Sequence, residues 1–169
     1  MKINISDIVK TDGASLDINF SEVINELNTV IGEEFIFNGP VEFTGKLVNT
    51  SGVLKLEGHV QAEFATKCYR CLKNVDGKVD ADINESFVDK DKVDEDTDVE
   101  MYTYESNFIE VDKILIDNIV LNLPMKQICE VECKGICPKC GTDLNIGTCE
   151  CKDEDINPKM EVLKNFFKS

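Results

Sequence analysis

Eight cysteines occur in this chain as four close pairs, and thiolate sulfurs in such pairs can bind metal ions. The pairs are Cys68/Cys71, Cys129/Cys133, Cys137/Cys140 and Cys149/Cys151. A tetrahedral zinc ion takes four soft ligands at about 2.3 Å, and two cysteines separated by two or three residues can face one ion without strain. Each pair then supplies half a site, so the sequence predicts two four-thiolate sites and two Zn²⁺ ions per chain.

A disulfide framework and a dithiol redox centre are the alternative uses of so many cysteines. Charged residues interrupt the apolar ones in residues 1–17, which is not the pattern of a secretion signal. No stretch of the sequence has the length and apolar character of a membrane span. We therefore expect a cytoplasmic protein without membrane contact. In a reducing cytoplasm, close cysteine pairs bind metal more often than they form disulfides.

The spacing of the cysteines indicates which of them share an ion. The strongest local signal is Cys137-Pro138-Lys139-Cys140-Gly141, because proline directs the turn and glycine allows the backbone to fold close to the metal. Cys149 and Cys151 form the pair within easy reach of this knuckle, although one intervening residue gives them a narrower bite. The simplest C-terminal site therefore combines these two pairs.

The other two pairs would form a site from distant parts of the chain, with Cys68 and Cys71 joined to Cys129 and Cys133. In an alternative assignment, Cys133 joins the C-terminal site and leaves Cys129 or Cys151 free. Four protein ligands leave no open position for water, so such a site holds shape and does not catalyse hydrolysis. Structural zinc contributes on the order of 10 kcal/mol, which is comparable to the stability of a whole domain.

The formal net charge of −15 excludes a long basic groove for nucleic acid and makes a basic protein an easier partner. Positive charge nevertheless gathers near the cysteines, and the candidate RNA- or partner-binding residues are Lys67, Arg70, Lys73, Lys134 and Lys139. Lysines beside zinc-thiolate sites can also simply compensate negative charge. Arg70 is the only arginine, and its planar guanidinium suits either a functional contact or a structural hydrogen bond.

Alternating hydrophobicity predicts an antiparallel sheet. Residues 54–64 alternate between apolar and polar side chains, as a half-buried strand does, and residues 41–47 do so before the turn-forming segment 49–52. A further strand is expected over residues 78–88, which places the first cysteine pair at the turn between two antiparallel strands. His59, the only histidine, falls on the polar face and is interpreted as solvated, which removes the commonest general base.

Apolar residues at helical spacing predict short helices over residues 23–31 and 111–123. We expect Asp112 to cap the second of these helices and Pro124 to end it. A terminal helix is expected to begin at Asn157-Pro158, where proline suits the first helical position.

These patterns predict an α+β fold with an antiparallel sheet of hairpin or meander type, a few short helices and two zinc knuckles. The acidic segment 89–100 has almost nothing apolar to bury and is predicted to be a solvated connection. Residues 1–128 are expected to form a mainly antiparallel β domain that carries the first cysteine pair. Residues 129–169 are expected to form a C-terminal zinc-binding segment with a short terminal helix.

Several motifs of this chain occur together in one known family. They are Cys68-Tyr69-Arg70-Cys71-Leu72, Leu123-Pro124, Cys129, Cys133-Lys134-Gly135-Ile136-Cys137-Pro138-Lys139-Cys140-Gly141, Leu144-Asn145, Cys149-Glu150-Cys151 and Asn157-Pro158-Lys159 to Leu163. With these motifs the sequence resembles the YceD family of bacterial large-subunit rRNA accumulation proteins over nearly its whole length. The resemblance implies a cytoplasmic, non-catalytic factor needed for accumulation of 23S rRNA, and hence for making the large ribosomal subunit.

Together with the acidity, the resemblance suggests a zinc-stapled assembly factor that binds the large-subunit precursor, with 23S rRNA or a basic ribosomal protein as partner and no small-molecule substrate. The alternative is a zinc-ribbon-like protein that contacts RNA directly. An enzyme would need a nucleophile with a positioned base, a metal with an open position or a phosphate loop, and the sequence offers none of these. Thiol redox chemistry at Cys68 and Cys71 is a further, minor alternative.

Overall fold

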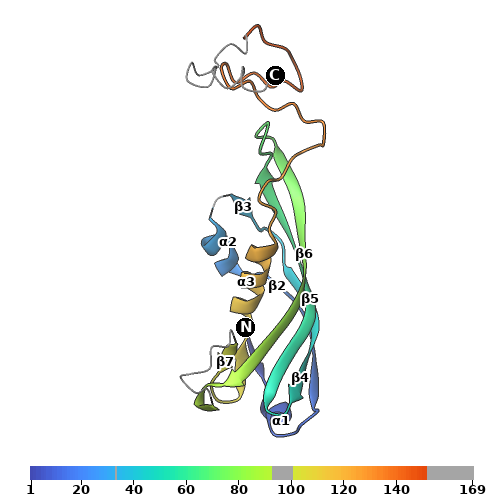
Figure 1. Cartoon of the computed structure of the whole chain (residues 1–169), viewed down its shortest axis with the longest axis vertical. Coiled ribbons are helices and arrows are strands. Elements are labelled where there is room, and N and C mark those ends of the chain that lie inside the picture. The colour runs from blue at the N-terminus through green and yellow to red at the C-terminus, as the bar shows by residue number, and fades with distance from the viewer. Residues whose placement is uncertain (33, 93–100, 152–169) are drawn as a thin grey trace, which may run out of the picture.

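The computed structural model describes residues 1–32, 34–92 and 101–151. The elements in chain order are β1 (Lys2–Asn4), α1 (Ser6–Val9), β2 (Ser15–Glu22), α2 (Asn25–Ile31), β3 (Phe35–Ile36), β4 (Val41–Thr50), β5 (Val53–Lys67), β6 (Asn74–Asp89), a 3-10 turn (Lys90–Lys92), β7 (Tyr102–Tyr104), β8 (Phe108–Glu110) and α3 (Asp112–Asn122). Figure 1 shows an elongated molecule in which β5 and β6 lead to the cysteine-rich segment at one end.

The main sheet has the strand order β2-β4-β5-β6-β7, and β3 also pairs with β5. Its pairings are antiparallel except that of β6 with β7, which is parallel. A separate antiparallel pair joins β1 to β8. The predicted α+β class, with an antiparallel sheet and short helices, is confirmed. The parallel strand β7 departs from the expected hairpin pattern. The sequence did not predict this strand, because its three residues give too short a run of alternating hydrophobicity.

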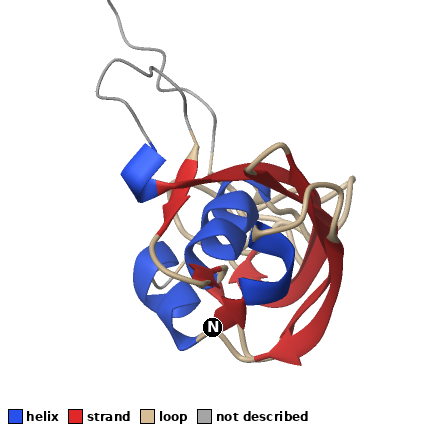
Figure 2. Ribbon diagram, turned by 90° about the horizontal axis from the view of Figure 1, so that it is seen from below, coloured by secondary structure: helices blue, strands red, loops and turns tan. Residues whose placement is uncertain are grey.

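One face of the sheet is buried because apolar residues alternate along its longest strands. In β5, for example, Val60, Ala62 and Phe64 are buried. Figure 2 shows the helices inside the curve of the sheet, where α3 contributes Ile114 and Leu115 to the hydrophobic core. The core therefore lies between one sheet face and the helices, and the cysteines are not part of it.

The opposite face of the sheet is polar and carries the only histidine of the chain. The ring nitrogens of His59 lie 2.8 Å from a carboxylate oxygen of Asp80 and 2.9 Å from one of Asp82. The hydrogen bond to Asp82, with the charge of Asp80 nearby, raises the pKa of His59. His59 is thus a partly exposed member of a charged surface network, in keeping with its interpretation as solvated.

The helices begin and end close to the residues expected, but one capping interaction differs. The residue before α3 is Val111, and no side chain caps this helix. The prediction that Asp112 caps α3 is therefore wrong, because its carboxylate instead pairs with the N-terminal ammonium group of Met1.

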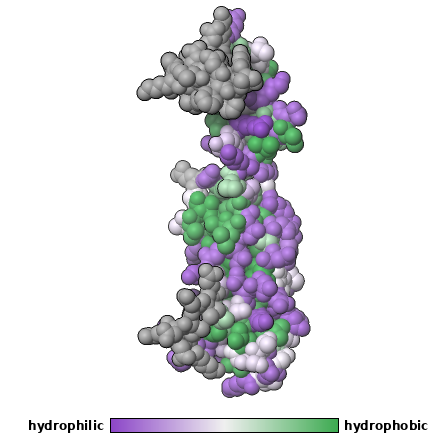
Figure 3. Space-filling view, viewed as in Figure 1, coloured by the Kyte–Doolittle hydropathy of each residue, from purple (hydrophilic) through white to green (hydrophobic). Residues whose placement is uncertain are grey.

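In α2, Val30 is exposed, and Figure 3 shows hydrophobic residues gathered over this helix and β3.

Two of the expected features fall on residues outside the described ranges. These are most of the acidic connection, residues 93–100, and the terminal helix from Asn157-Pro158 onward. At the start of the connection, Asp89 still belongs to β6 and Lys90–Lys92 form the 3-10 turn. Within the described part of the chain, no helix has the length and apolar character needed to cross a membrane.

Two facing glycines make room for an aromatic ring at the centre of the sheet. Gly45 of β4 and Gly58 of β5 are directly opposite each other. A Cβ atom at Gly58 would lie 2.6 Å from the Phe43 ring and 2.8 Å from the Cα atom of Gly45. Phe43 is itself almost fully buried, so its ring cannot swing out into solvent. The glycine pair is therefore needed for close packing rather than for chain flexibility.

The variant Gly58→Ala is expected to lower the free energy of unfolding by about 2 kcal/mol, because the added methyl group must displace the Phe43 ring or the neighbouring strand. Urea unfolding measures this change. Gly39→Ala is the matched control, since a Cβ atom there meets no atom within 4 Å, and its effect should stay within about 0.5 kcal/mol. Equal stability of both variants would contradict the packing described.

Candidate metal centres

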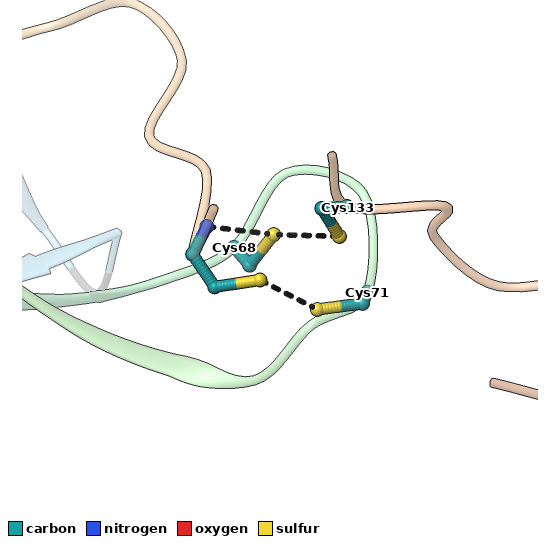
Figure 4. Close-up of side chains that lie close together, drawn as sticks. Cys68, Cys71 and Cys133 are labelled. Carbon is teal, nitrogen blue, oxygen red and sulfur yellow. Dashed lines mark hydrogen bonds between the residues drawn. The ribbon is translucent and has the colours of Figure 1, made fainter. Parts of the chain in front are cut away.

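The first cysteine centre lies at the tip of the long β5–β6 hairpin. β5 ends at Lys67 and β6 begins at Asn74, so Cys68 and Cys71 occupy the turn between them. Cys129 and Cys133 come from the chain after α3, and the four Sγ atoms all lie within 4.8 Å of one another. Figure 4 shows Cys68, Cys71 and Cys133 pointing toward one another at this tip. The structure thus brings together the four cysteines expected to form the first site.

The sulfur separations fit a metal ion better than disulfides. The Sγ atoms of Cys68 and Cys133 are 3.9 Å apart, and those of Cys71 and Cys129 are 3.6 Å apart. A tetrahedral ion with metal–sulfur bonds of about 2.3 Å places its ligand sulfurs about 3.8 Å from each other. A disulfide requires about 2.05 Å. The arrangement therefore leaves space for one ion at the centre of the four sulfurs.

The second centre combines the remaining four cysteines, Cys137, Cys140, Cys149 and Cys151, whose Sγ atoms also lie within 4.8 Å of one another. The alternative grouping, with Cys133 in this centre, is not the one that the structure forms. The two centres differ in exposure. In the first, three cysteines are buried and Cys129 is half-buried, whereas in the second only Cys137 is buried.

The first turn holds its two sulfurs by backbone hydrogen bonds. The amide of Cys68 donates to the carbonyl of Lys73 at 2.7 Å, and the amide of Leu72 donates to the carbonyl of Cys68 at 2.9 Å. These bonds close a tight loop with both thiols on one side. Leu72 has a φ angle of 61°, in the left-handed region that costs a non-glycine residue about 1 kcal/mol or more.

The second turn has the same pattern of hydrogen bonds. The amide of Cys137 donates to the carbonyl of Thr142, and the amide of Gly141 donates to the carbonyl of Cys137, both at 2.8 Å. The fifth residue, Gly141, has a φ angle of 76°, which glycine adopts without strain. Both CxxC segments are therefore knuckles of one kind, and they differ in the residue placed at the left-handed position.

The local surroundings favour ionisation of one thiol in the first centre. Burial acts to raise the pKa of Cys68, but backbone N–H groups of Cys71, Cys129 and Arg70 bring it down to about 6. Burial, together with the neighbouring sulfurs of Cys133 and Cys71, raises the pKa of Cys129 to about 12. Four thiolates therefore repel one another at this distance. A divalent cation removes that repulsion, which is why such a cluster suits a metal.

The second centre has the same division between its thiols. The hydroxyl of Thr142, which lies 3.2 Å from the Cys140 sulfur, and its backbone N–H lower the pKa of Cys140 to about 6. The neighbouring Cys140 sulfur and burial raise the pKa of Cys151 to about 12. Full ionisation of this cluster likewise requires a cation at its centre.

Arg70 connects the first centre to the chain that leads to the second. Its Nη1 atom donates to the carbonyl of Cys133 at 2.8 Å, and its own carbonyl accepts from the amide of Ile136 at 3.1 Å. A Cβ atom at Gly135 would lie 2.9 Å from that carbonyl oxygen, so glycine allows the two segments to meet. The structural hydrogen bond considered for Arg70 is thus present.

Asn145 is a site residue to which the sequence analysis assigned no role. Its side-chain oxygen accepts from the amide of Lys134 at 2.7 Å, and its side-chain nitrogen lies 3.6 Å from the sulfur of Cys133. An amide that donates to a ligand sulfur orients the ligand and offsets its negative charge. The sequence signal for this role was the position of the Leu144-Asn145 motif between the two cysteine pairs of the second centre.

We refer to residues 67–74 and 124–151 as the cysteine head. The predicted basic residues all belong to it: Lys67, Arg70, Lys73, Lys134 and Lys139, each of them exposed. Lys67 and Lys73 stand immediately before and after the first knuckle. Lys126, which was not among the predicted site residues, places its Nζ atom 4.7 Å from the centre of the Tyr69 ring.

Known proteins similar to this chain come from bacteria and plants. An uncharacterized protein of Mycobacterium tuberculosis is 33% identical over 97 residues, which cover 56% of this chain and 46% of that protein. The uncharacterized protein YlbN of Bacillus subtilis is 24% identical over 169 residues, which cover 99% of this chain and 97% of that protein. The chain spans about half the length of the mycobacterial relatives.

A maize protein is also similar. It is the chloroplastic large ribosomal RNA subunit accumulation protein YCED homolog 1, which is 24% identical over 160 residues, covering 76% of this chain and 54% of that protein. No solved structure matches the chain. The sequence model for large ribosomal RNA subunit accumulation protein YceD matches residues 56–167, which include every cysteine of both centres. The chain therefore belongs to the YceD family.

Proposed function

We propose that this protein is a non-catalytic zinc protein of the cytoplasm that supports accumulation of the large-subunit ribosomal RNA. Membership of the YceD family supports the ribosomal role. The observation that carries the proposal is the first cysteine centre, because its sulfurs join the tip of β5–β6 to the chain after α3. An ion bound there fixes a surface at the end of a rigid sheet, and a surface fixed in advance binds with less loss of entropy.

In this proposal all eight cysteines are zinc ligands, four to each ion. Four sulfurs around each ion leave no position for a water molecule or a substrate. The zinc ions then act by holding segments together, and they take no part in chemical steps. Cys68 and Cys71 are ligands rather than a redox pair, because each also lies close to a sulfur of the other segment: Cys68 is 3.9 Å from Cys133, and Cys71 is 3.6 Å from Cys129.

The partner is the precursor of the large subunit, reached through 23S rRNA or through a basic ribosomal protein. The net charge of −15 favours a basic protein for most of the surface. The cysteine head differs, because the candidate binding residues Lys67, Lys73, Lys134 and Lys139 belong to it. The guanidinium of Arg70 already donates a hydrogen bond to the carbonyl of Cys133. We therefore assign the direct contacts with the partner to the lysines rather than to Arg70.

Depletion of the protein in its own cells tests this function. The ratio of 23S to 16S rRNA should fall, because the large subunit lacks a factor that acts during its assembly. Wild-type protein should restore the ratio, and a Cys133→Ser variant should not. An unchanged ratio after depletion, with ribosomal subunits in normal proportion, would count decisively against the proposal.

A further inference from the structure

The two knuckles differ at one position in a way that points to binding. Both turns need a left-handed residue after the second cysteine, and Gly141 meets this need without strain. Leu72 occupies the same position in the first knuckle, where it has a φ angle of 61° and is 58% exposed. The leucine therefore strains the backbone without contributing to the core. Strain of this kind is typical of positions where a side chain is kept for function.

Tyr69 lies in the same knuckle and is also presented to solvent. The residue is 63% exposed, while its amide donates to the carbonyl of Gln127 at 2.8 Å and so fixes the backbone at this position. The Nζ atom of Lys126 lies 4.7 Å from the ring centre. The ammonium group of Lys126 lies over one face of this ring, so a nucleobase would stack on the opposite face, where the tyrosine offers a flat, preorganised surface close to a positive charge.

The charge of this knuckle is opposite to that of the chain as a whole. Residues 67–74 contain Lys67, Arg70 and Lys73 and no acidic residue, although the formal net charge of the protein is −15. The acidic molecule as a whole repels a polyanion, whereas these three cations attract one to this segment. The knuckle therefore provides ring, apolar side chain and lysines within one short segment.

We propose that the first knuckle binds unpaired RNA, with a base stacked on Tyr69 and packed against Leu72 while Lys67 and Lys73 contact the flanking phosphates. This inference rests on the proposed ribosomal function and names the surface and the partner. RNA fits this surface better than an apolar segment of a basic ribosomal protein does. The lysines on either side of the knuckle attract the phosphates of RNA, whereas they would repel a basic protein. RNA in single-stranded form exposes the base faces that stacking requires.

The proposal is tested by titrating an unstructured RNA into the metal-loaded full chain. An RNA of about 12 nucleotides is suitable, because this length is within the site sizes of proteins that bind single strands. The chain has no tryptophan and three tyrosines, and of these Tyr104 is buried and Tyr102 half-buried. Tyrosine emission should therefore fall as a base stacks on Tyr69. Fluorescence anisotropy of labelled RNA gives the affinity in parallel.

Substitutions at Tyr69 and Leu72 separate binding from folding. Tyr69→Leu should bind RNA about tenfold more weakly, whereas Tyr69→Phe keeps an aromatic ring and should bind like the wild type. Leu72→Gly should also weaken binding, yet its melting temperature should be unchanged or higher, because glycine relieves the left-handed strain. A merely structural leucine would not give this opposite pair of effects.

Two results would overturn the proposal: failure of the metal-loaded protein to bind the RNA at low salt, or wild-type affinity in Tyr69→Leu. Either can occur while depletion still lowers 23S rRNA, and the proposed function would then stand without this RNA contact. In that case, binding of an apolar peptide that is lost in Leu72→Gly would identify a protein as the occupant of the surface. Unchanged rRNA after depletion would instead contradict the proposed function itself.

Discussion

Replacing Cys133 with serine is expected to remove one of two metal ions per chain and to open the first knuckle. Serine is a poor zinc ligand, and loss of a structural zinc site forfeits a contribution on the order of 10 kcal/mol. The free energy of opening at the amides of Cys68, Tyr69 and Leu72, all of which are hydrogen-bonded, should therefore fall by about 4 kcal/mol or more. Hydrogen exchange of these amides measures the change.

Cys140→Ser is the matched control in the second centre. It should also cost one ion per chain, but the amides that lose protection should be those of Cys137 and Gly141. The amides of the first knuckle should keep theirs. Retention of two ions in either variant, or loss of protection at the wrong knuckle, would show that the sulfurs are not divided between two centres as described.

Chelation is expected to remove the two ions in separate steps, with the second centre emptied first. Cys140 and Cys151 are exposed, whereas Cys68, Cys71 and Cys133 are buried, so a competing ligand reaches the second ion more easily. The amide resonances of the second knuckle should shift before those of the first. Simultaneous release, or release from the first centre before the second, would contradict the difference in exposure.

Removal of both ions should open the cysteine head and leave the sheet folded. The buried cluster around the first centre is small, because it consists of Cys68, Cys71 and Cys133 with a few partly buried neighbours. The main core instead contains the apolar faces of β4, β5 and α3, which need no metal to remain buried. Circular dichroism should therefore retain the β-sheet signal after chelation. Complete unfolding would show that the ions stabilise the whole chain rather than one end.

The sequence predicted what depends on local pattern. Strict alternation over residues 54–64 identified β5, and the further strand expected over residues 78–88 placed the first cysteine pair at the turn between β5 and β6. Spacing also favoured the grouping that the structure forms, since Cys137 and Cys140 have a nearby partner pair while Cys68 and Cys71 do not. These predictions succeed because each rests on neighbours in sequence.

What the sequence did not predict depends on contacts between distant segments. The guanidinium of Arg70 finds the Cys133 carbonyl only after the chain returns past α3. The carboxylate of Asp112 pairs with the N-terminal ammonium group because β1 pairs with β8, immediately before α3. The strained position of the exposed Leu72 can be recognised only by comparison with Gly141, which occupies the equivalent position because both knuckles share one hydrogen-bond pattern. No local propensity encodes these relations.

The central claim is that coordinated thiolates hold this end of the molecule together. Native mass spectrometry of protein purified without added metal, followed by the same measurement after acid denaturation, tests it most directly. We expect a native mass that exceeds the mass of the fully reduced chain by two zinc ions, with eight thiols available for alkylation once the metal is released. A native chain without metal, or one whose cysteines are joined in disulfides, would contradict the account.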